Sequence, residues 1–306
     1  MKIAVIGGAG AMGSIFGGLL AQANNDVTVI DVAANAVAVI NQEGLRIDEP
    51  SGQSQVVRLP ATSDPTQVGP VDLVVVFVKC YHTASALQNV APLLGAHTAV
   101  LSLQNGWGNA PRIAEIVGQE RVLVGVTYHS GTLLKPGYVL HAGRGQTYIG
   151  ELSGQMSDRL HHIAETFIQA GLDVTPTETV LRQIWSKLAL NVCTLPTSAL
   201  LGWFAGQLGE HDGTRQLMRG LLDEVIAVAN AQGIELDPHE RWESITGVLQ
   251  RAMGAKSSML QDVEQHRRTE IDVINGAIVS AGQRLKIATP YNQAMVWLVK
   301  ALEETF

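Results

Sequence analysis

The sequence has few cysteines and no long apolar run. Only Cys80 and Cys193 occur among 306 residues; they could pair, but we interpret them as isolated thiols of a reducing compartment. No apolar run approaches the roughly 20 residues that a membrane-spanning helix needs. The N-terminal residues also lack the charged and apolar regions of a signal peptide. These absences predict a cytoplasmic protein without a membrane partner.

Positive charge is scarce as well. The net charge is −7, and we find no basic cluster beyond the pair Arg267–Arg268, which is typical of a solvated helix face. A nucleic-acid partner normally requires a basic face, so we expect none. Apolar residues make up 46% of the chain and charged residues 16%, which favours a well-buried globular protein. The length is sufficient for two domains with separate cores.

Two common catalytic signatures are missing. The adjacent pair His161–His162 points to different sides of a helix, and no other histidines or cysteines have the spacing of zinc ligands, so no metal site is predicted. His129 and His141 lie in strand-like segments, and we interpret them as structural. The G-x-S-x-G turn of serine hydrolases is absent. Metal-assisted and serine-hydrolase chemistries therefore have no support.

Short β-branched runs alternate with helical patterns in the first half of the chain. Residues 71–78 are apolar on both faces, as in a central strand of a parallel sheet. Arg46–Ile47 and Gln55–Leu59, separated by Pro50–Gly52, predict a hairpin. Strands that alternate with helices predict an α/β doubly wound sheet of the Rossmann type. Further expected elements are strands at Lys2–Ile6, Val27–Ile30, Thr98–Leu103 and Val122–Tyr128, and a helix at Met12–Gln22.

Strand patterns stop near residue 178, and amphipathic helical patterns follow. We therefore expect a Rossmann domain over residues 1–178 and an all-helical domain over residues 179–306. Asp237 followed by Pro238 and Glu240 predicts a helix start. Ser258-x-x-Gln261 predicts a capping box that opens a long helix running toward Gly282.

A glycine motif follows the first predicted strand. Gly8, Gly10 and Gly13 form G-x-G-x-x-G at the start of a helix, with Ala11 and Met12 between them. Gly8 permits the tight turn, Gly10 lets the backbone approach a pyrophosphate, and Gly13 lets helix and strand pack closely. The N–H groups of the helix N-terminus then bind the phosphates. The alternative is an ordinary strand–helix turn, but the context favours a dinucleotide site.

Asp31 ends the second predicted strand, 18 residues after Gly13. A carboxylate there accepts hydrogen bonds from the adenosine ribose hydroxyls and repels a 2′-phosphate, which favours NADH over NADPH. The alternative is that Asp31 caps the following helix over residues 32–42. The next basic residue along the chain is Arg46.

Lys187 and Asn191 lie four residues apart on one flank of a predicted helix, beside its apolar stripe. A lysine in that position would be partly desolvated. The alternative is a lysine that extends to solvent with an asparagine beside it.

Six features of the sequence occur together in one order: GAGAMG at 8–13, Lys79, Gln-Asn-Gly at 104–106, WSKLALN at 185–191, SSMLQD at 257–262 and TEIDVINGA at 269–277. In these features the sequence resembles the ketopantoate reductase (2-dehydropantoate 2-reductase) family over essentially its whole length. The resemblance implies a Rossmann domain followed by a helical domain like the C-terminal domain of 6-phosphogluconate dehydrogenase, and a role in pantothenate biosynthesis. It also implies that Lys79, at the end of the fourth strand, contacts the nucleotide.

The resemblance also implies roles for single residues. The family's general acid corresponds to Lys187 and its conserved glutamate to Glu270, which would orient Lys187 or bind a substrate hydroxyl. Asn105, Asn191 and Ser258 match substrate-contacting positions, and Asn105 would also contact the nicotinamide ribose. The implied reaction is hydride transfer from NAD(P)H to the keto carbon of ketopantoate or a similar 2-keto acid, giving an (R)-2-hydroxy acid.

The chain departs from the family pattern at three places. Asp31 and Val32 stand where the family usually has a basic residue for NADPH, and Leu195 and Ala205 replace two asparagines. Asp31 and the segment 297–303 instead resemble the NAD-dependent D-2-hydroxyacid (D-mandelate-like) dehydrogenase subgroup, which acts on branched or aromatic 2-keto acids. We therefore expect NAD(P)H as the cofactor, with a preference for NADH, and both substrate classes stay open.

A non-catalytic module that senses NAD(H) is the alternative from another class. The retained Lys187, Asn191, Ser258 and Glu270 weigh against it, because a sensor needs no acid. The expected partner is a small-molecule 2-keto acid. The oligomeric state is open, with a homodimer among the options.

Overall fold

The computed structural model describes all 306 residues and divides into two compact units. Unit 1 comprises Met1–Gln104 and Asn109–Val180, and unit 2 comprises Asn105–Gly108 and Leu181–Phe306. The short segment Asn105–Gly108 therefore belongs to unit 2, although the residues on both sides of it belong to unit 1.

Unit 1 contains all the strands. They are β1 (Lys2–Ile6), β2 (Asp26–Ile30), β3 (Leu45–Asp48), β4 (Ser54–Val57), β5 (Ala61–Thr62), β6 (Val71–Val76), β7 (Leu94–Ser102), β8 (Val122–Thr127), β9 (Ser130–Lys135), β10 (Tyr138–Gly143), β11 (Thr147–Glu151) and β12 (Val174–Pro176). Its helices are α1 (Ala11–Gln22), α2 (Ala34–Glu43), α3 (Thr83–Leu87), α4 (Asn109–Val117) and α5 (Asp158–Gln169), with 3-10 turns η1 (Pro65–Gln67), η2 (Cys80–His82), η3 (Ala91–Leu93) and η4 (Gln119–Arg121).

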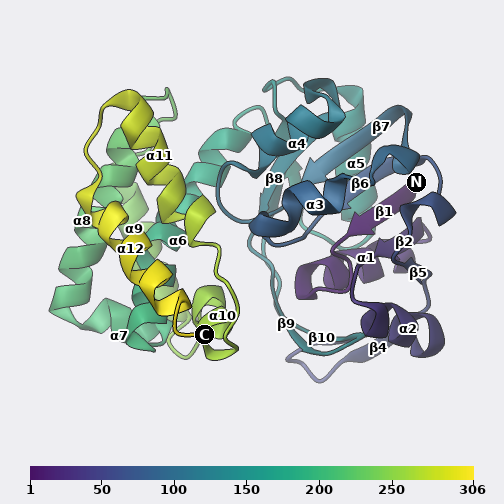
Figure 1. The fold of residues 1–306 in the computed structure, drawn as a ribbon, viewed down its shortest axis with the longest axis horizontal. Coiled ribbons are helices and arrows are strands. Elements are labelled where there is room, and N and C mark those ends of the chain that lie inside the picture. Colours follow the sequence, from purple (N-terminus) through teal and green to yellow (C-terminus); the bar gives the residue numbers. More distant parts are fainter. The chain divides into compact units, whose positions relative to one another are not determined.

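The larger sheet of unit 1 has eight strands in the order β12-β11-β8-β7-β6-β1-β2-β5. Strands β2, β1, β6, β7 and β8 are parallel, and β11 runs antiparallel to β8. Residues 73–76 of β6 are fully buried because helices cover both faces, with α3 and α4 over one face and α5 over the other (Figure 1). The expected doubly wound Rossmann sheet is confirmed.

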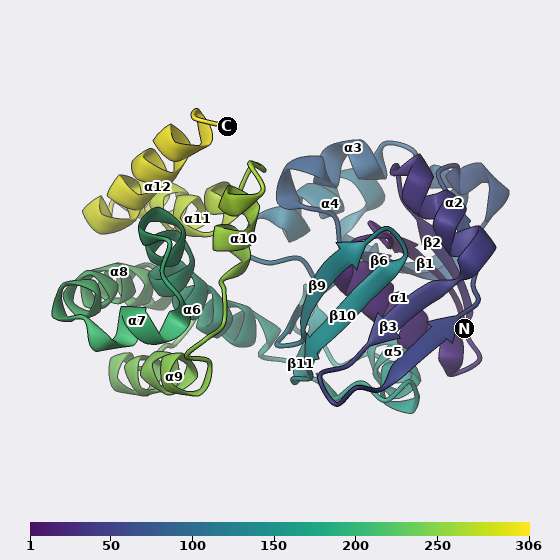
Figure 2. The same ribbon diagram turned by 90° about the horizontal axis from the view of Figure 1, so that it is seen from below.

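Helix α1 lies between the larger sheet and a second, four-stranded sheet of order β4-β3-β10-β9 (Figure 2). Glycines allow the close approach on both sides: a Cβ at Gly17 would contact Val5 of the larger sheet, and one at Gly18 would lie 2.5 Å from Ile47 of the smaller sheet. Strands β3 and β4 form the expected hairpin, since Arg46 pairs with Val56 in antiparallel register.

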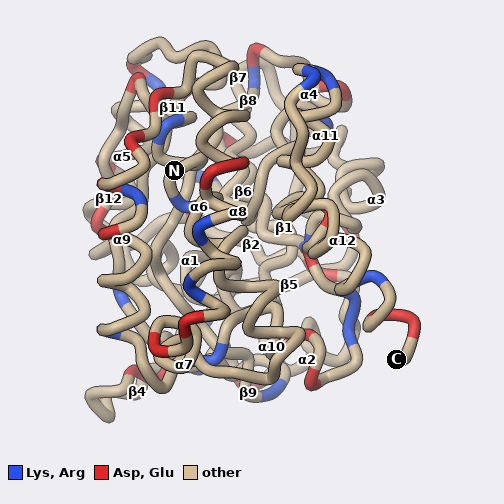
Figure 3. Tube along the Cα trace, turned by 90° about the vertical axis from the view of Figure 1, so that its left-hand side faces the viewer, with Lys and Arg blue, Asp and Glu red and all other residues tan.

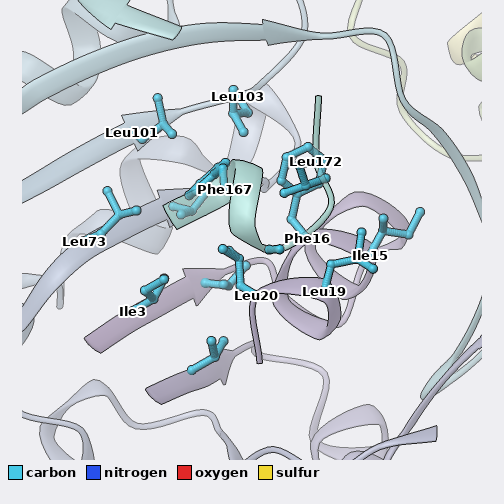
Figure 4. Close-up of a cluster of buried hydrophobic side chains, with 14 of the residues drawn as sticks. Ile3, Ile15, Phe16, Leu19, Leu20, Leu73, Leu101, Leu103, Phe167 and Leu172 are labelled. Atoms are coloured by element: carbon cyan, nitrogen blue, oxygen red, sulfur yellow. The ribbon is translucent and has the colours of Figure 1, made fainter. Parts of the chain in front are cut away.

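One apolar core joins α1, α5 and the face of the larger sheet beneath them. Phe16 of α1 and Phe167 of α5 meet with ring centroids 6.1 Å apart, and Leu73 and Leu101 extend from neighbouring strands toward them (Figure 4). This core fixes the start of α1 relative to the carboxyl end of β1, where the glycine motif lies.

Unit 2 is helical, as expected for the C-terminal part of the chain. Its helix α6 begins at the last residue of unit 1. The elements are α6 (Val180–Leu201), α7 (Ala205–Glu210), α8 (Asp212–Asn230), α9 (Pro238–Arg251), α10 (Ser258–Glu264), η5 (Ile271–Val273), α11 (Asn275–Leu285) and α12 (Pro290–Glu303). Trp185, Met218 and Ile278 are fully buried in its core.

Of the two helices predicted from capping patterns in unit 2, one is confirmed and one is wrong. Asp237 caps α9 by accepting a hydrogen bond from the Glu240 N–H at 2.7 Å, as predicted. The long helix predicted from Ser258 is wrong: α10 ends at Glu264, and His266 takes a left-handed φ of 49°. The cap is Ser257, whose hydroxyl accepts from the Leu260 N–H at 3.1 Å. The break makes room for η5, which belongs to the site described below.

Pro196 lies inside α6, and its effect on the helix is compensated by a buried side chain. Proline has no N–H, so the carbonyl of Val192, four residues earlier, loses its intrahelical donor. The side-chain amide of Asn275 donates to that carbonyl at 3.2 Å and to Asn292 Oδ1 at 3.0 Å. Asn275 is fully buried. The pair of Pro196 and Asn275 thus links α6 to the start of α11.

Lysine and arginine residues are interspersed with aspartate and glutamate along the trace (Figure 3). None of the helices is both long and apolar enough to span a bilayer.

Candidate active site

The glycine motif follows β1, and its three glycines have different surroundings. A Cβ at Gly8 would lie 2.7 Å from the Val5 carbonyl, and one at Gly13 would lie 2.6 Å from Gly8 Cα, so both are required by packing inside the protein. A Cβ at Gly10 would meet only the Gly7 carbonyl, at 3.3 Å. The space outside Gly10 is therefore open to a ligand. Such a cradle fits the pyrophosphate of a dinucleotide.

The amides at the start of α1 face no capping side chain. Gly10 is the N-cap and makes no side-chain hydrogen bond, and the Ser14 N–H makes the first helical bond, to Gly10 O at 2.9 Å. The N–H groups of Ala11, Met12 and Gly13 precede that bond and are available to an anion. The donor set of this turn therefore fits two phosphates.

Asp31 stands at the carboxyl end of β2, beside the glycine turn. Its Oδ2 accepts from the Ala9 N–H at 3.1 Å, and its Oδ1 accepts from the Ala33 N–H at 3.0 Å. The N-cap of α2 is Ala33, which has no side-chain cap, so Asp31 forms a local turn rather than a helix cap. Its carboxylate is fixed against the glycine turn, where a ribose would follow the pyrophosphate.

Neither position 32 nor Arg46 provides an unpaired cation for a 2′-phosphate beside Asp31. Val32 is 91% exposed and carries no charge. Arg46 is held elsewhere, because its guanidinium donates to both carboxylate oxygens of Asp48 at 2.9 Å and lies 4.4 Å from the Tyr138 ring centre. The hydrogen bond to Asp48 raises the pKa of Arg46.

Lys79 follows β6 and precedes the 3-10 turn η2. Strand β6 is the parallel neighbour of β1, so their carboxyl ends lie at the same edge of the sheet. Gly7 has a φ of 74°, and a Cβ there would lie 2.8 Å from the Val78 N atom. The glycine turn and Lys79 are therefore neighbours. Gly7 is a fourth required glycine of this turn that the motif did not predict.

In unit 2 three of the predicted residues come together. The Lys187 ammonium on α6 donates to Asn105 Oδ1 at 3.0 Å. The pKa of Lys187 is lowered to about 8 by burial, and the Glu270 carboxylate partly opposes this shift. Glu270 is itself only 7% exposed. A partly buried ammonium with an amide acceptor and a carboxylate nearby can supply a proton at neutral pH.

The 3-10 turn η5 holds the Asn105 and Glu270 backbones in place. Glu270 caps this turn, and its carbonyl accepts from the Val273 N–H at 3.1 Å. The Val273 carbonyl in turn accepts from the Trp107 N–H at 2.8 Å. Trp107 is half-buried against the core of unit 2.

The other two predicted substrate residues are Asn191 on α6 and Ser258 on α10. Asn191 is buried one helical turn after Lys187, on the same flank of α6, and Leu195 follows one turn later. Ser258 is exposed at the first position of α10, and no hydrogen bond of its hydroxyl to the other predicted residues is found. Ala205 begins α7 and packs against the core.

Sequence reasoning missed one contact beside Glu270. Glu303, near the end of α12, accepts from both the N–H and the hydroxyl of Thr269, at 2.7 and 2.6 Å. Thr269 is fully buried and directly precedes Glu270. The resemblance of the segment 297–303 to a subgroup gives no indication of this contact.

Two family models match the chain. The family described as Ketopantoate reductase PanE/ApbA matches residues 3–154, and Ketopantoate reductase PanE/ApbA C terminal matches residues 179–303. The 2-dehydropantoate 2-reductase of Halobacterium salinarum is 34% identical over 296 residues, which cover 97% of each chain. That of Pyrococcus horikoshii is 34% identical over 303 residues, covering 99% of this chain and 98% of the relative.

Solved structures of similar proteins share the fold of this chain. The ternary structure of a D-mandelate dehydrogenase with NADH and anilino(oxo)acetate superposes with a TM-score of 0.94 at 31% identity, covering 100% of this chain and 99% of that chain. A PanE/ApbA family ketopantoate reductase from Ralstonia eutropha superposes with a TM-score of 0.92 at 34% identity, with the same coverage.

Proposed function

The chain belongs to the ketopantoate reductase family of oxidoreductases, which act with a nicotinamide dinucleotide, and we propose that it reduces a 2-keto acid to an (R)-2-hydroxy acid with Lys187 as the proton donor. The observation that carries this proposal is the partly buried contact between the Lys187 ammonium and Asn105 Oδ1 beside Glu270.

Lys187 has the properties that the reaction requires. The bound nicotinamide supplies a hydride, so negative charge develops on the keto oxygen. An ammonium at that oxygen stabilises the charge and then gives up its proton. With a pKa of about 8, Lys187 is still mostly charged at neutral pH and is a stronger acid than an exposed lysine.

Glu270 and Asn105 keep the ammonium charged and oriented. The Glu270 carboxylate raises the pKa of Lys187 against the effect of burial. Asn105 Oδ1 accepts one of the three ammonium protons and so orients the ammonium for the substrate oxygen. Asn191, one turn away, is in reach of the same flank of α6 and is proposed to contact the substrate, as is Ser258.

The dinucleotide is proposed to bind unit 1. The open cradle at Gly10 and the amides of Ala11 and Met12 fit its pyrophosphate. Lys79 at the same sheet edge supplies a cation. Asp31 would accept hydrogen bonds from the adenosine ribose, and Arg46, the next basic residue along the chain, is paired with Asp48 instead of facing a 2′-phosphate. We therefore propose NADH as the preferred cofactor.

Two substrate classes are supported by different observations. The curated relatives are named for 2-dehydropantoate, which favours ketopantoate. Leu195, two turns from Lys187, and Ala205 are apolar where the family has asparagines, and D-mandelate dehydrogenase is a solved neighbour. These favour a 2-keto acid with a branched or aromatic side chain, as for a D-2-hydroxyacid dehydrogenase.

A panel of 2-keto acids crossed with NADH and NADPH tests the proposal. We expect turnover of at least one branched, aromatic or 4-hydroxylated keto acid, with the larger kcat/KM for NADH. Lys187→Ala should lower kcat about 100-fold or more while NADH still binds. An enzyme that binds NADH but reduces no member of the panel would instead support the sensing module.

A further inference from the structure

The segment Asn105–Gly108 is held on the 3-10 turn η5 by a clasp of two contacts. The Trp107 N–H donates to the Val273 carbonyl at 2.8 Å. Gly106 has a φ of 79°, and a Cβ there would lie 2.8 Å from the Val273 carbonyl carbon and overlap its oxygen. A side chain at position 106 therefore cannot coexist with this clasp without displacing the segment from η5.

The same turn carries Glu270. The Glu270 carbonyl accepts from the Val273 N–H at 3.1 Å, so the two residues are joined by one hydrogen-bonded turn. The backbone after Asn105 is thereby fixed relative to the backbone of Glu270. From this fixed point the Asn105 side chain reaches the Lys187 ammonium, with its Oδ1 at 3.0 Å from Nζ.

We propose that Gly106 and the Val273 carbonyl are positioning groups for the reaction, because their clasp sets Asn105 Oδ1 against the Lys187 ammonium. This inference rests on the proposed function, in which Lys187 donates the proton. Neither Gly106 nor Val273 touches the reacting atoms in this account. They act through Asn105.

The clasp has a consequence that a purely structural contact would lack. The Glu270 carboxylate raises the pKa of Lys187 against burial. An acceptor on an ammonium also favours its charged form, so the contact with Asn105 Oδ1 should act in the same direction. Displacing Asn105 should lower that pKa. The rate of keto acid reduction, which requires charged Lys187, should then decline at a lower pH than in the wild type.

Gly106→Ala is the test, and Gly108→Ala is its matched control. Gly108 has a φ of 115°, so alanine is strained there too, but a Cβ at Gly108 has no atom within 4 Å. Both variants strain the backbone of the same segment, but only Gly106→Ala places a Cβ against the Val273 carbonyl. Asn105→Ala shows the effect of losing the acceptor altogether.

We expect Gly106→Ala to lower kcat about tenfold or more and to move the high-pH decline downward by about half a pH unit or more, approaching Asn105→Ala. Gly108→Ala should stay within about twofold of wild type in kcat and keep its pH profile, even where its melting temperature falls. Equal kcat and equal pH profiles for the two alanine variants would overturn the inference.

Two further measurements distinguish a failure of the clasp from a failure of the proposed function or of folding. Lys187→Ala tests the proposed function separately: if it removes the high-pH decline while Gly106→Ala matches its control, only the clasp is refuted. If Gly106→Ala does not fold, hydrogen exchange of the wild-type Trp107 amide decides. Protection of that amide comparable with the interior of α6 supports the clasp, and exchange at the rate of an open loop overturns it.

Discussion

Replacing Asp31 by asparagine should change the cofactor preference of the enzyme. The Asp31 carboxylate is fixed by the N–H groups of Ala9 and Ala33, at 3.1 and 3.0 Å, and its remaining lone pairs can accept from ribose hydroxyls. A charge-assisted hydrogen bond contributes about 1.5–3 kcal/mol. Since about 1.4 kcal/mol is a factor of ten, the wild type should prefer NADH at least about tenfold in kcat/KM.

Asp31→Asn removes the repulsion of a 2′-phosphate and keeps one acceptor oxygen. The preference should therefore weaken mainly because kcat/KM for NADPH improves. Adding Val32→Arg should extend the effect, because position 32 is exposed and a guanidinium there can pair with the phosphate. An amide can accept only one of the two backbone N–H groups, so unfolding should also become easier by about 1 kcal/mol.

Steady-state kinetics with both cofactors provides the assay, and Asp72→Asn is the control. Asp72 also accepts a backbone N–H, from Lys2 at 2.7 Å, but it lies near the start of β6, away from the carboxyl edge. Asp72→Asn makes the same change in net charge and should leave the ratio of kcat/KM for NADH and NADPH unaltered. A wild-type enzyme that prefers NADPH, or equal effects of Asp31→Asn and Asp72→Asn, would refute this account of Asp31.

Three other changes should have measurable effects. Burial lowers the pKa of His129 in the folded protein to about 4, whereas in the unfolded chain this histidine has its ordinary pKa of about 6.5. Between these pH values only the unfolded chain is protonated at His129, so the stability present above about pH 6.5 should be lost as the pH falls toward 4. Urea unfolding of wild type and His129→Phe at both pH values checks this, and an equal pH dependence would contradict it. Asn275→Ala leaves the Val192 carbonyl without its donor and should cost about 1–3 kcal/mol, less in a Pro196→Ala background that restores the N–H; equal costs in the two backgrounds would argue against the pairing. Glu270→Ala should lower kcat/KM about 100-fold, because the carboxylate supports the charge of Lys187, and unchanged kinetics would remove Glu270 from the mechanism.

Much of unit 1 could be predicted because its signals are local. The first strand was predicted at the residues that the structure gives, and the hairpin of β3 and β4 followed from two short runs around Pro50–Gly52. The close packing at Gly13 also followed from the motif alone. Such features depend on neighbours within a few tens of residues.

The contacts that assemble the candidate site are distant in sequence and could not be derived from local pattern. Lys187 meets Asn105 across 82 residues, and Asn275 meets Val192 across 83. The resemblance to a family named Lys187 and Asn105 but not the clasp that joins Gly106 to Val273. The break after α10 was missed because the serine pattern indicates a helix start and carries no information about where the helix ends.

The pH dependence of kcat for keto acid reduction, measured for wild type and Lys187→Ala, tests the central claim most directly. We predict that wild-type kcat declines as the pH rises through about 8, the pKa of Lys187. The proposed role of Lys187 requires this decline. It also predicts that Lys187→Ala loses about 100-fold or more in kcat together with this decline, while NADH binding is retained. A Lys187→Ala enzyme with near-normal turnover and an unchanged pH profile would contradict it.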